Sequence, residues 1–420
     1  VSNTAFRGFG GPQGMLGMER IIDAIAWATG RDPLDIRKAN FYAPGRDVTP
    51  YGQHVADNII LPLVETLEQT SEYRRRRREI EAFNASSPIL KRGIALTPVK
   101  FGISFTLSHL NQAGALVHVY QDGSVMLNHG GTEMGQGLFL KVAQVVAEEF
   151  GISIERVKIT STRTDKVPNT APTAASAGSD LNGMAARNAA RVIKERLTAF
   201  ASELYGVDPA RVRFRNGMVF VGDFSLPFGE LTKKAVLARI SLSSTGFYRT
   251  PDITWDRAKA TGNPFYYFAY GACCSEVEID AMTGENRVSR VDILHDVGRS
   301  LNPAIDIGQI EGGFVQGMGW LTTEELVYDA DGRLSTHAPS TYKIPVASDI
   351  PADFRVALWD GFNSRETIYA SKAVGEPPVM LAIAVFSALA DACEAAAKGA
   401  GVRLHAPATP EAVLRAMQGW

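Results

Sequence analysis

Cysteine is scarce in this chain, which has only Cys273, Cys274 and Cys393 among its 420 residues. Three cysteines at these spacings cannot form a disulfide framework, and they match no zinc or iron–sulfur ligand pattern. The composition therefore favours a reduced, cytoplasmic protein whose own residues carry no metal cluster.

Net charge is also small, at −2, which gives no reason to expect nucleic acid or a membrane as a partner. We also expect no segment with the length and apolar character of a membrane helix. The densest charge run is Arg74 to Arg78, flanked by Glu72, Glu79 and Glu81. Five consecutive residues occupy every side of a helix, so the pattern predicts a solvated helix rather than a basic binding face.

Several common catalytic and nucleotide-binding signatures are absent. The sequence contains no Walker-type phosphate loop, no GxGxxG after a strand, and no HExxH, GxSxG or CxxC. An ordinary nucleotide, a zinc-protease site and a serine-hydrolase site are therefore not indicated. The chain does contain 39 glycines, and these are clustered.

Hydrophobic periodicity predicts helices and strands without a regular βαβ order. The fold class is therefore predicted to be α+β (mixed α/β) rather than a doubly wound sheet. Asp32 is expected to cap a short helix, and residues 84–88 read as a linker. The predicted helices are 18–29, 61–83, 138–150, 183–205, 310–320 and 378–397, and the predicted strands are 115–120, 124–128, 156–162, 275–281 and 287–294.

Five segments are too specialised for ordinary turns. They are FRGFGG at Phe6, FGISFT at Phe101, GGTEMGQG at Gly130, PNTAPTAASAGSDLNG at Pro168 and KAVGEPP at Lys372. Glycine-rich loops let the backbone approach a ligand closely, and two of these loops lead into helices, whose free N–H groups bind anions. Together they indicate a large anionic ligand with many polar edges.

This set of segments resembles the molybdopterin-binding subunit of the xanthine dehydrogenase family of molybdenum hydroxylases. STGFYRTPDI at Ser244, LNPAIDIGQIEGGFVQG at Leu301 and PSTYKIP at Pro339 extend the resemblance over nearly the whole chain. FGISFT and NTAPTAAS are more similar to xanthine dehydrogenases than to aldehyde oxidases or carbon monoxide dehydrogenases.

The resemblance implies a molybdopterin-binding fold whose N-terminal part lies upstream, because FRGFGG is internal in the family. Residues 1–85 would end a first cofactor-binding domain and residues 90–420 would form a second. The chain would be a fragment or one half of a split subunit, with an active site that is incomplete alone. A complementary N-terminal half would supply a further glutamate and arginine for the purine.

The implied activity is oxidation of xanthine and hypoxanthine to urate with oxygen from water. Electrons would leave the molybdenum–molybdopterin cofactor through 2Fe–2S clusters and FAD, on other chains or segments, to NAD. The sequence leaves open the pterin form and the oligomeric state. No nucleic acid or membrane partner is expected.

The resemblance assigns Glu376, in VGEPP, as the catalytic general base. A carboxylate in a dry pocket gains basicity, and the flanking glycine and prolines restrict its loop. An isolated loop glutamate would ordinarily be a salt-bridged residue. Phe9 and Phe105 match a purine sandwich, and Thr106 could donate a hydrogen bond to the substrate, although buried phenylalanines and strand threonines usually only pack.

The backbones of Arg7 and Ala175 match positions beside the molybdenum. In the family no side chain ligates the metal, so no histidine is assigned a role, including His129 and His295. The resemblance places the cofactor against Arg7, Met134, Gly135, Gln136, Thr173, Ala174, Ala175, Ser176, Ser179, Gln309 and Gly375.

Two alternatives remain open at this point. The chain could belong to a related hydroxylase for another heterocycle or an aldehyde. It could instead be a non-catalytic pterin-binding module or an inactive fragment, although such a module needs neither a base nor a purine clamp.

Overall fold

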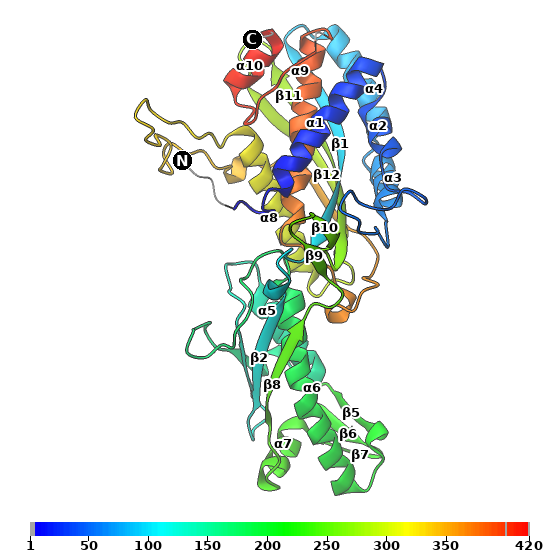
Figure 1. Cartoon of the computed structure of the whole chain (residues 1–420), viewed down its shortest axis with the longest axis vertical. Coiled ribbons are helices and arrows are strands. Elements are labelled where there is room, and N and C mark those ends of the chain that lie inside the picture. The colour runs from blue at the N-terminus through cyan, green and yellow to red at the C-terminus, as the bar shows by residue number, and fades with distance from the viewer. Residues whose placement is uncertain (1–4, 400, 419–420) are drawn as a thin grey trace.

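The computed structural model describes residues 5–399 and 401–418. The molecule is elongated and has two lobes (Figure 1). One lobe contains both described ends of the chain, and the other is built from its middle part. The mixture of strands and helices has no regular βαβ order, so the predicted mixed α/β class is confirmed.

The first lobe is organised around a four-stranded sheet with the order β1-β11-β12-β13. β1 and β11 pair antiparallel along their whole length, and β12 and β13 pair parallel. The chain leaves this sheet at the end of β1 and returns at the start of β11, so the residues between form the second lobe (Figure 1). The strands are β1 (Leu90–Ile103), β11 (Tyr267–Asp280), β12 (Asn286–His295) and β13 (Asp353–Leu358).

Both faces of this sheet are buried. Alternate residues of a strand point to opposite faces. Cys273 accordingly packs in one core with α8 and α9, and Cys274 packs in another core with α2, α3 and α4. The helices of this lobe are α1 (Gly11–Thr29), α2 (Pro33–Ala39), α3 (Ile60–Thr70), α4 (Tyr73–Ser86), α8 (Pro303–Thr322), α9 (Ile383–Ala396) and α10 (Pro410–Gln418).

The second lobe packs α5 and α6 against a sheet with the order β4-β3-β2-β8. A three-stranded sheet with α7 forms its far end, and β9 pairs with β10 (Figure 1). Its elements are β2 (Gln112–Val119), β3 (Val125–His129), α5 (Leu138–Phe150), β4 (Val157–Ile159), α6 (Gly178–Tyr205), β5 (Val212–Arg215), β6 (Met218–Val221), β7 (Phe224–Pro227), α7 (Phe228–Leu237), β8 (Ser243–Arg249), β9 (Thr254–Asp256) and β10 (Thr261–Asn263).

Many local predictions are confirmed. The hairpin of β2 and β3, the bounds of α5 and the strands joined by MTGE are as expected, and the Asp32 side chain accepts from the N–H of Leu34. The helix predicted over 61–83 is wrong in one respect, because Glu72 has a positive φ of 57° and divides it into α3 and α4. The predicted linker at 84–88 is also largely wrong, since α4 continues to Ser86.

Other helix boundaries also differ from the prediction. α1 begins at Gly11 rather than at residue 18, and α8 spans Pro303–Thr322 rather than 310–320. α6 begins at Gly178 rather than Gly183, so the small residues before Gly183 already form its first turn. The last long helix begins as a 3-10 turn, η6 (Pro377–Ala382), because paired prolines at its start remove backbone donors.

The prediction that Arg74 to Arg78 form a solvated run is wrong. Arg76 is buried, and its guanidinium contacts Asp292 at 2.9 Å and Glu276 at 2.8 Å. Arg77 pairs with Asp32 at 3.1 Å. These side chains join α4 to the sheet and to α2, whereas Arg75 is half exposed. The sequence did not show which side of the helix would face acidic partners on distant strands.

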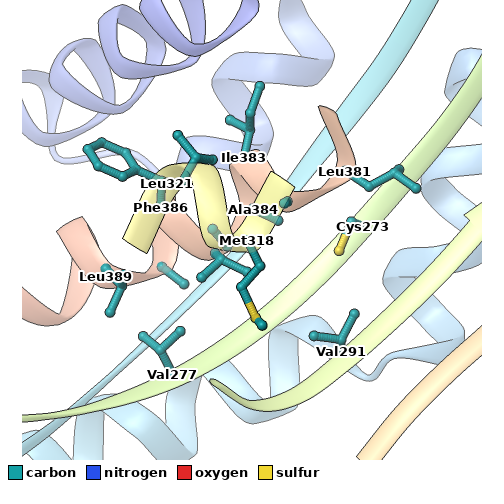
Figure 2. Packing of buried hydrophobic residues seen from close by; sticks show 14 of the residues in the cluster. Cys273, Val277, Val291, Met318, Leu321, Leu381, Ile383, Ala384, Phe386 and Leu389 are labelled. Carbon is teal, nitrogen blue, oxygen red and sulfur yellow. The ribbon is translucent and has the colours of Figure 1, made fainter. Parts of the chain in front are cut away.

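The expectation that no segment has the length and apolar character of a membrane helix is also wrong. Pro377–Ala396 has both properties over 20 residues. Most of this segment is buried, and Figure 2 shows Phe386 and Leu389 of α9 among side chains of α8 and the sheet. A helix that is apolar on all sides is expected in the core of a large protein.

Candidate active site

A cavity of about 750 Å³ lies where the two lobes meet. Residues from the segment before α1, the loop before α5, the start of α6, α8 and the KAVGEPP loop line it. The structure therefore brings together four of the five specialised segments, which are far apart in sequence. The predicted site residues among the lining are Arg7, Phe9, Met134, Gly135, Gln136, Thr173, Ala174, Ala175, Ser176, Ser179, Gln309, Gly375 and Glu376.

Glu376 is held by three hydrogen bonds at the cavity wall. Its carboxylate accepts from the Ser176 hydroxyl at 2.9 Å and from the N–H of Gly8 at 3.3 Å. Its own N–H donates to the Ser176 hydroxyl at 2.7 Å. Burial raises the pKa of Glu376, while Ser176, Gly8 and Arg7 act in the opposite direction. Such a carboxylate can accept a proton at a fixed position.

Arg7 ties the start of the chain to the Glu376 loop and to α8. Its Nε donates to the carbonyl of Gly375. Nη2 donates to the side-chain and backbone oxygens of Gln309 at 3.3 Å, and Nη1 donates to Gln316 at 3.4 Å. Burial lowers the pKa of Arg7, and the carboxylate of Glu376 raises it. The guanidinium therefore stands as a cation beside the general-base candidate.

The turn before α6 presents backbone donors to the cavity. Ala175 and Ser176 have positive φ values of 55° and 57°, a conformation that turns successive N–H groups toward one side. No side chain caps the start of α6 in the described structure. Gly178 and Ser179, at that start, line the cavity. A helix start of this kind favours an anionic ligand.

The start of α5 is arranged differently from the expectation. The Glu133 carboxylate accepts from the N–H groups of Gly135 at 2.8 Å, Gly137 at 3.0 Å and Phe139 at 2.9 Å. Both helix starts were expected to offer free donors, but at α5 Glu133 already occupies the N–H groups of the N-cap Gly137 and of Phe139, together with the loop N–H of Gly135. Met134 and Gly135 still face the cavity.

The three proposed substrate-binding residues are separated in this structure. Phe9 lines the cavity, is 79% exposed and has a φ of 48°. Phe105 and Thr106 follow β1 and are not among the lining residues; Phe105 is fixed by its N–H donating to Asn111 at 2.8 Å. Their substrate role stays a prediction.

Sequence reasoning missed several charged residues of the cavity. Lys141 of α5 forms a buried ion pair with Asp306 of α8, and Lys372 pairs with Asp296 at 2.5 Å. Asp180 of α6 is also buried there, and burial raises its pKa to about 7. One signal was available, since Lys141 is close in the helix to the apolar residues Leu138, Val142 and Val145 of α5. Its partner lies 165 positions away and could not be inferred.

The histidines near the site are neutral. Burial lowers the pKa of His129 to about 4, and burial with the nearby Lys372 lowers that of His295 to about 3. Within residues 5–399 and 401–418, no group of three or more His, Cys, Asp or Glu side chains could hold a metal ion.

Comparison with known proteins shows which family this chain belongs to. The molybdopterin cofactor-binding domain family matches residues 66–351, and a second family of the same description matches residues 1–41. The chain belongs to the molybdopterin cofactor-binding domain family. Its xanthine dehydrogenase/oxidase relative in Mus musculus is 47% identical over 99% of this chain and 30% of the relative. The xanthine dehydrogenase of Dictyostelium discoideum is 46% identical over 94% of this chain and 28% of the relative.

Solved structures of this architecture agree with the fold. Quinoline 2-oxidoreductase from Pseudomonas putida 86 superposes with a TM-score of 0.84 at 26% identity, covering 99% of this chain and 53% of that one. Aldehyde oxidoreductase from Desulfovibrio desulfuricans superposes with a TM-score of 0.80 at 26% identity, covering 98% of this chain and 41% of that one. The chain spans about 30% of the length of the curated relatives named above.

The cavity fits a molybdopterin cofactor by the chemistry of its donors. Uncapped N–H groups at the start of α6 and the hydroxyls of Thr173 and Ser179 suit the phosphate and polar edges of a pterin. Gly135 has open space around its Cα, so the backbone there can approach a flat ring closely. The residues therefore match the family's ligand.

Proposed function

We propose that this chain is the cofactor-binding and base-carrying part of a molybdenum hydroxylase that oxidises xanthine and hypoxanthine to urate. The observation that carries the proposal is Glu376, a half-buried carboxylate whose pKa is raised, fixed in the cavity by Ser176 and Gly8. The relatives in Mus musculus and Dictyostelium discoideum, named for xanthine, support the substrate class.

In this proposal the turn from Thr173 to Ser179 would hold the pterin and its phosphate through N–H groups and hydroxyls, and Met134 to Gln136 would contact the ring. Gln309, Arg7 and the backbone of Ala175 would lie near the metal. When bound, the cofactor supplies the redox centre that accepts two electrons from the substrate.

The chain's own contribution to the reaction is proton transfer and positioning. Glu376 accepts a proton from a water-derived hydroxyl group at the cavity, which makes that oxygen nucleophilic toward the substrate carbon. Burial favours this step by raising the pKa of the carboxylate, and the bonds from Ser176 and Gly8 fix its direction. Arg7 holds the carbonyl of Gly375, so the base stays on a rigid loop.

We further propose that the remaining parts lie outside this chain. A complementary N-terminal half completes the purine site, while 2Fe–2S and FAD parts carry electrons to NAD. Residues 1–85 and 90–420 would belong to successive cofactor-binding domains. Many proteins of this size and composition act in the cytoplasm, where the free, buried Cys273, Cys274 and Cys393 would remain reduced.

A second candidate is a hydroxylase for another heterocycle or an aldehyde. Phe105 and Thr106 lie outside the cavity lining, so the proposed purine clamp is not assembled by these residues alone. The solved structures that superpose on the chain include a quinoline 2-oxidoreductase and an aldehyde oxidoreductase. Comparing kcat/KM for xanthine, quinoline and an aldehyde would separate the two candidates.

The decisive experiment replaces the base in the full enzyme that contains this chain. Glu376→Gln keeps the size of the side chain and one acceptor oxygen but cannot accept the proton. We expect kcat for xanthine to fall by roughly 100-fold or more with molybdenum content unchanged. Glu311→Gln, the same substitution at an exposed position of α8, is the matched control.

Near-normal turnover by Glu376→Gln would contradict the proposal. A wild-type enzyme that binds the cofactor but oxidises none of the three substrates would instead support a non-catalytic pterin-binding module.

A further inference from the structure

A buried tyrosine links two walls of the cavity. Tyr267 lies on β11 and is 6% exposed. Its hydroxyl donates to the Asp180 carboxyl at 2.7 Å, and the N–H of Ala373 donates to the same hydroxyl at 2.8 Å. The Tyr267 oxygen therefore has one partner on α6 and another on the KAVGEPP loop.

Both partners lie close to residues that carry the proposed chemistry. Asp180 is in the first turn of α6, directly after the turn that contains Ala175 and Ser176. Ala373 is three residues before Glu376 in the chain. The Tyr267 hydroxyl thus connects the turn assigned to the cofactor with the loop assigned to the base.

The hydrogen bond from Ala373 to Tyr267 is one of several backbone bonds that anchor the KAVGEPP loop. The N–H of Lys372 donates to the carbonyl of Val297 at 2.7 Å, which holds the loop to the segment after β12. The N–H of Glu376 donates to Ser176 at 2.7 Å, which holds its other end. Between these points the Ala373 N–H donates to the Tyr267 hydroxyl and the Gly375 carbonyl accepts from Arg7, so the Tyr267 bond is one of the anchors that fix the loop.

We propose that Tyr267 is a positioning residue that sets the distance between the Glu376 loop and the cofactor-cradling turn. This inference rests on the proposed function, because it assumes that Glu376 is the base. Tyr267 is not itself among the cavity-lining residues and makes no hydrogen bond to Glu376; it acts through two lining residues, Ala373 and Asp180.

The surroundings keep the tyrosine in the form that this role requires. Burial raises the pKa of Tyr267 well above its usual value, so the hydroxyl remains a neutral donor. Tyr267 packs with Ile103, Ala269 and Ala373 in a small core cluster. Removing the hydroxyl while keeping the ring would leave this packing in place but would strip a hydrogen bond from two buried groups.

The experiment is Tyr267→Phe in the full enzyme, with Tyr266→Phe as the matched control. The Tyr266 hydroxyl donates only to the carbonyl of Glu366, at 3.4 Å, so its loss leaves the Glu376 loop anchored. For Tyr267→Phe we expect kcat per molybdenum to fall roughly 10- to 100-fold while KM changes less than about threefold, because the base is misplaced and not removed. Tyr266→Phe should keep both constants within about twofold of wild type.

A second readout does not depend on turnover. Hydrogen exchange of the Ala373 amide, followed by mass spectrometry, should be at least tenfold faster in Tyr267→Phe than in wild type or Tyr266→Phe. If Tyr267→Phe does not fold, the wild-type amide decides the matter, since a bonded and buried amide must be protected from exchange.

The outcomes distinguish this inference from the proposed function. Unchanged kcat and unchanged exchange in Tyr267→Phe, or an unprotected Ala373 amide in wild type, would overturn the positioning role. An active Glu376→Gln enzyme would overturn the proposed function, while the exchange result would still report the link between the loop and α6.

Discussion

At the scale of single residues, Glu376 receives opposing electrostatic influences. Burial raises its pKa, and the Ser176 hydroxyl, the Gly8 N–H and Arg7 stabilise its ionised form and lower it. The net direction is upward from the usual value of 4.5. A carboxylate with a raised pKa has a higher proton affinity, which suits a general base.

This balance predicts the pH dependence of xanthine oxidation. Glu376 must be ionised to act, so kcat/KM should fall as pH falls through its raised pKa, with a midpoint above 4.5. Ser176→Ala removes a bond to the ionised form, and the midpoint should move to still higher pH. A pH profile of kcat/KM per molybdenum measures both.

Ser289→Ala, a remote serine whose hydroxyl donates to the carbonyl of Glu276, serves as the control. A Ser176→Ala midpoint equal to wild type would show that the hydroxyl does not stabilise the carboxylate.

At the scale of secondary-structure elements, ion pairs join α4 to the sheet of the first lobe. Arg76 is 4% exposed and bonds Glu276 and Asp292, which also binds Arg290. Arg76→Met should cost about 3–5 kcal/mol of unfolding free energy, because it leaves the partly buried Glu276 carboxylate without its cation and Asp292 with Arg290 alone. The urea midpoint of the full enzyme measures this loss.

The neighbouring Arg75 provides the matched control. Its side chain is 50% exposed and pairs only with Glu72 and Glu79 on the same helix or beside it. Arg75→Met should leave the urea midpoint nearly unchanged. Equal losses for both variants would contradict the assignment of Arg76 as a buried link.

Strand β1 lies against α9 so closely that Gly93 has no room for a side chain. A Cβ there would lie 2.0 Å from the carbonyl oxygen of Ala388. Gly93→Ala should therefore destabilise the first lobe by roughly 1–3 kcal/mol or more, as overpacked cores do. Thermal unfolding of the full enzyme would show a lower midpoint.

Gly17→Ala is the comparison variant, because no atom lies within 4 Å of the added Cβ and the site is inside α1. Its helix propensity should rise slightly, and its unfolding midpoint should stay or increase. A Gly93→Ala enzyme as stable as this variant would show that β1 can move away from α9.

At the scale of the whole molecule, the fold leaves an apolar stripe on the outside of α1. Met18, Ile21 and Ile25 are 56%, 54% and 44% exposed. Within this chain α1 packs through Ile22 and Ala26, on a different side of the helix. Contiguous exposed apolar surface promotes association.

We therefore expect the separately expressed chain to self-associate as its concentration rises, as measured by sedimentation velocity. Replacing Met18, Ile21 and Ile25 together with glutamine should shift the distribution toward monomer. Met282→Gln is the control, since Met282 is 71% exposed outside this stripe. A monomer at all concentrations would contradict the prediction.

How far the sequence could predict the molecule depended on the range of the contacts involved. The α5 helix, the β2–β3 hairpin and the Asp32 cap are set by nearest neighbours. All three were predicted, α5 with its bounds and the hairpin strands to within three residues. The role of Arg76 was not predicted, because its partners lie about 200 positions away. The same reason explains the missed pair of Lys141 and Asp306.

By itself, the sequence determined which segments carry the site, because glycine clusters and the VGEPP loop have strong local conformational requirements, and it determined the family that they resemble. Only the tertiary structure decided that four of those segments share one cavity, that Phe105 lies outside its lining and that Glu133 occupies the start of α5. Tyr267 is the clearest case. Its hydroxyl joins Asp180 of α6 to Ala373 of the KAVGEPP loop, and such long-range hydrogen bonds exist only after the lobes have packed.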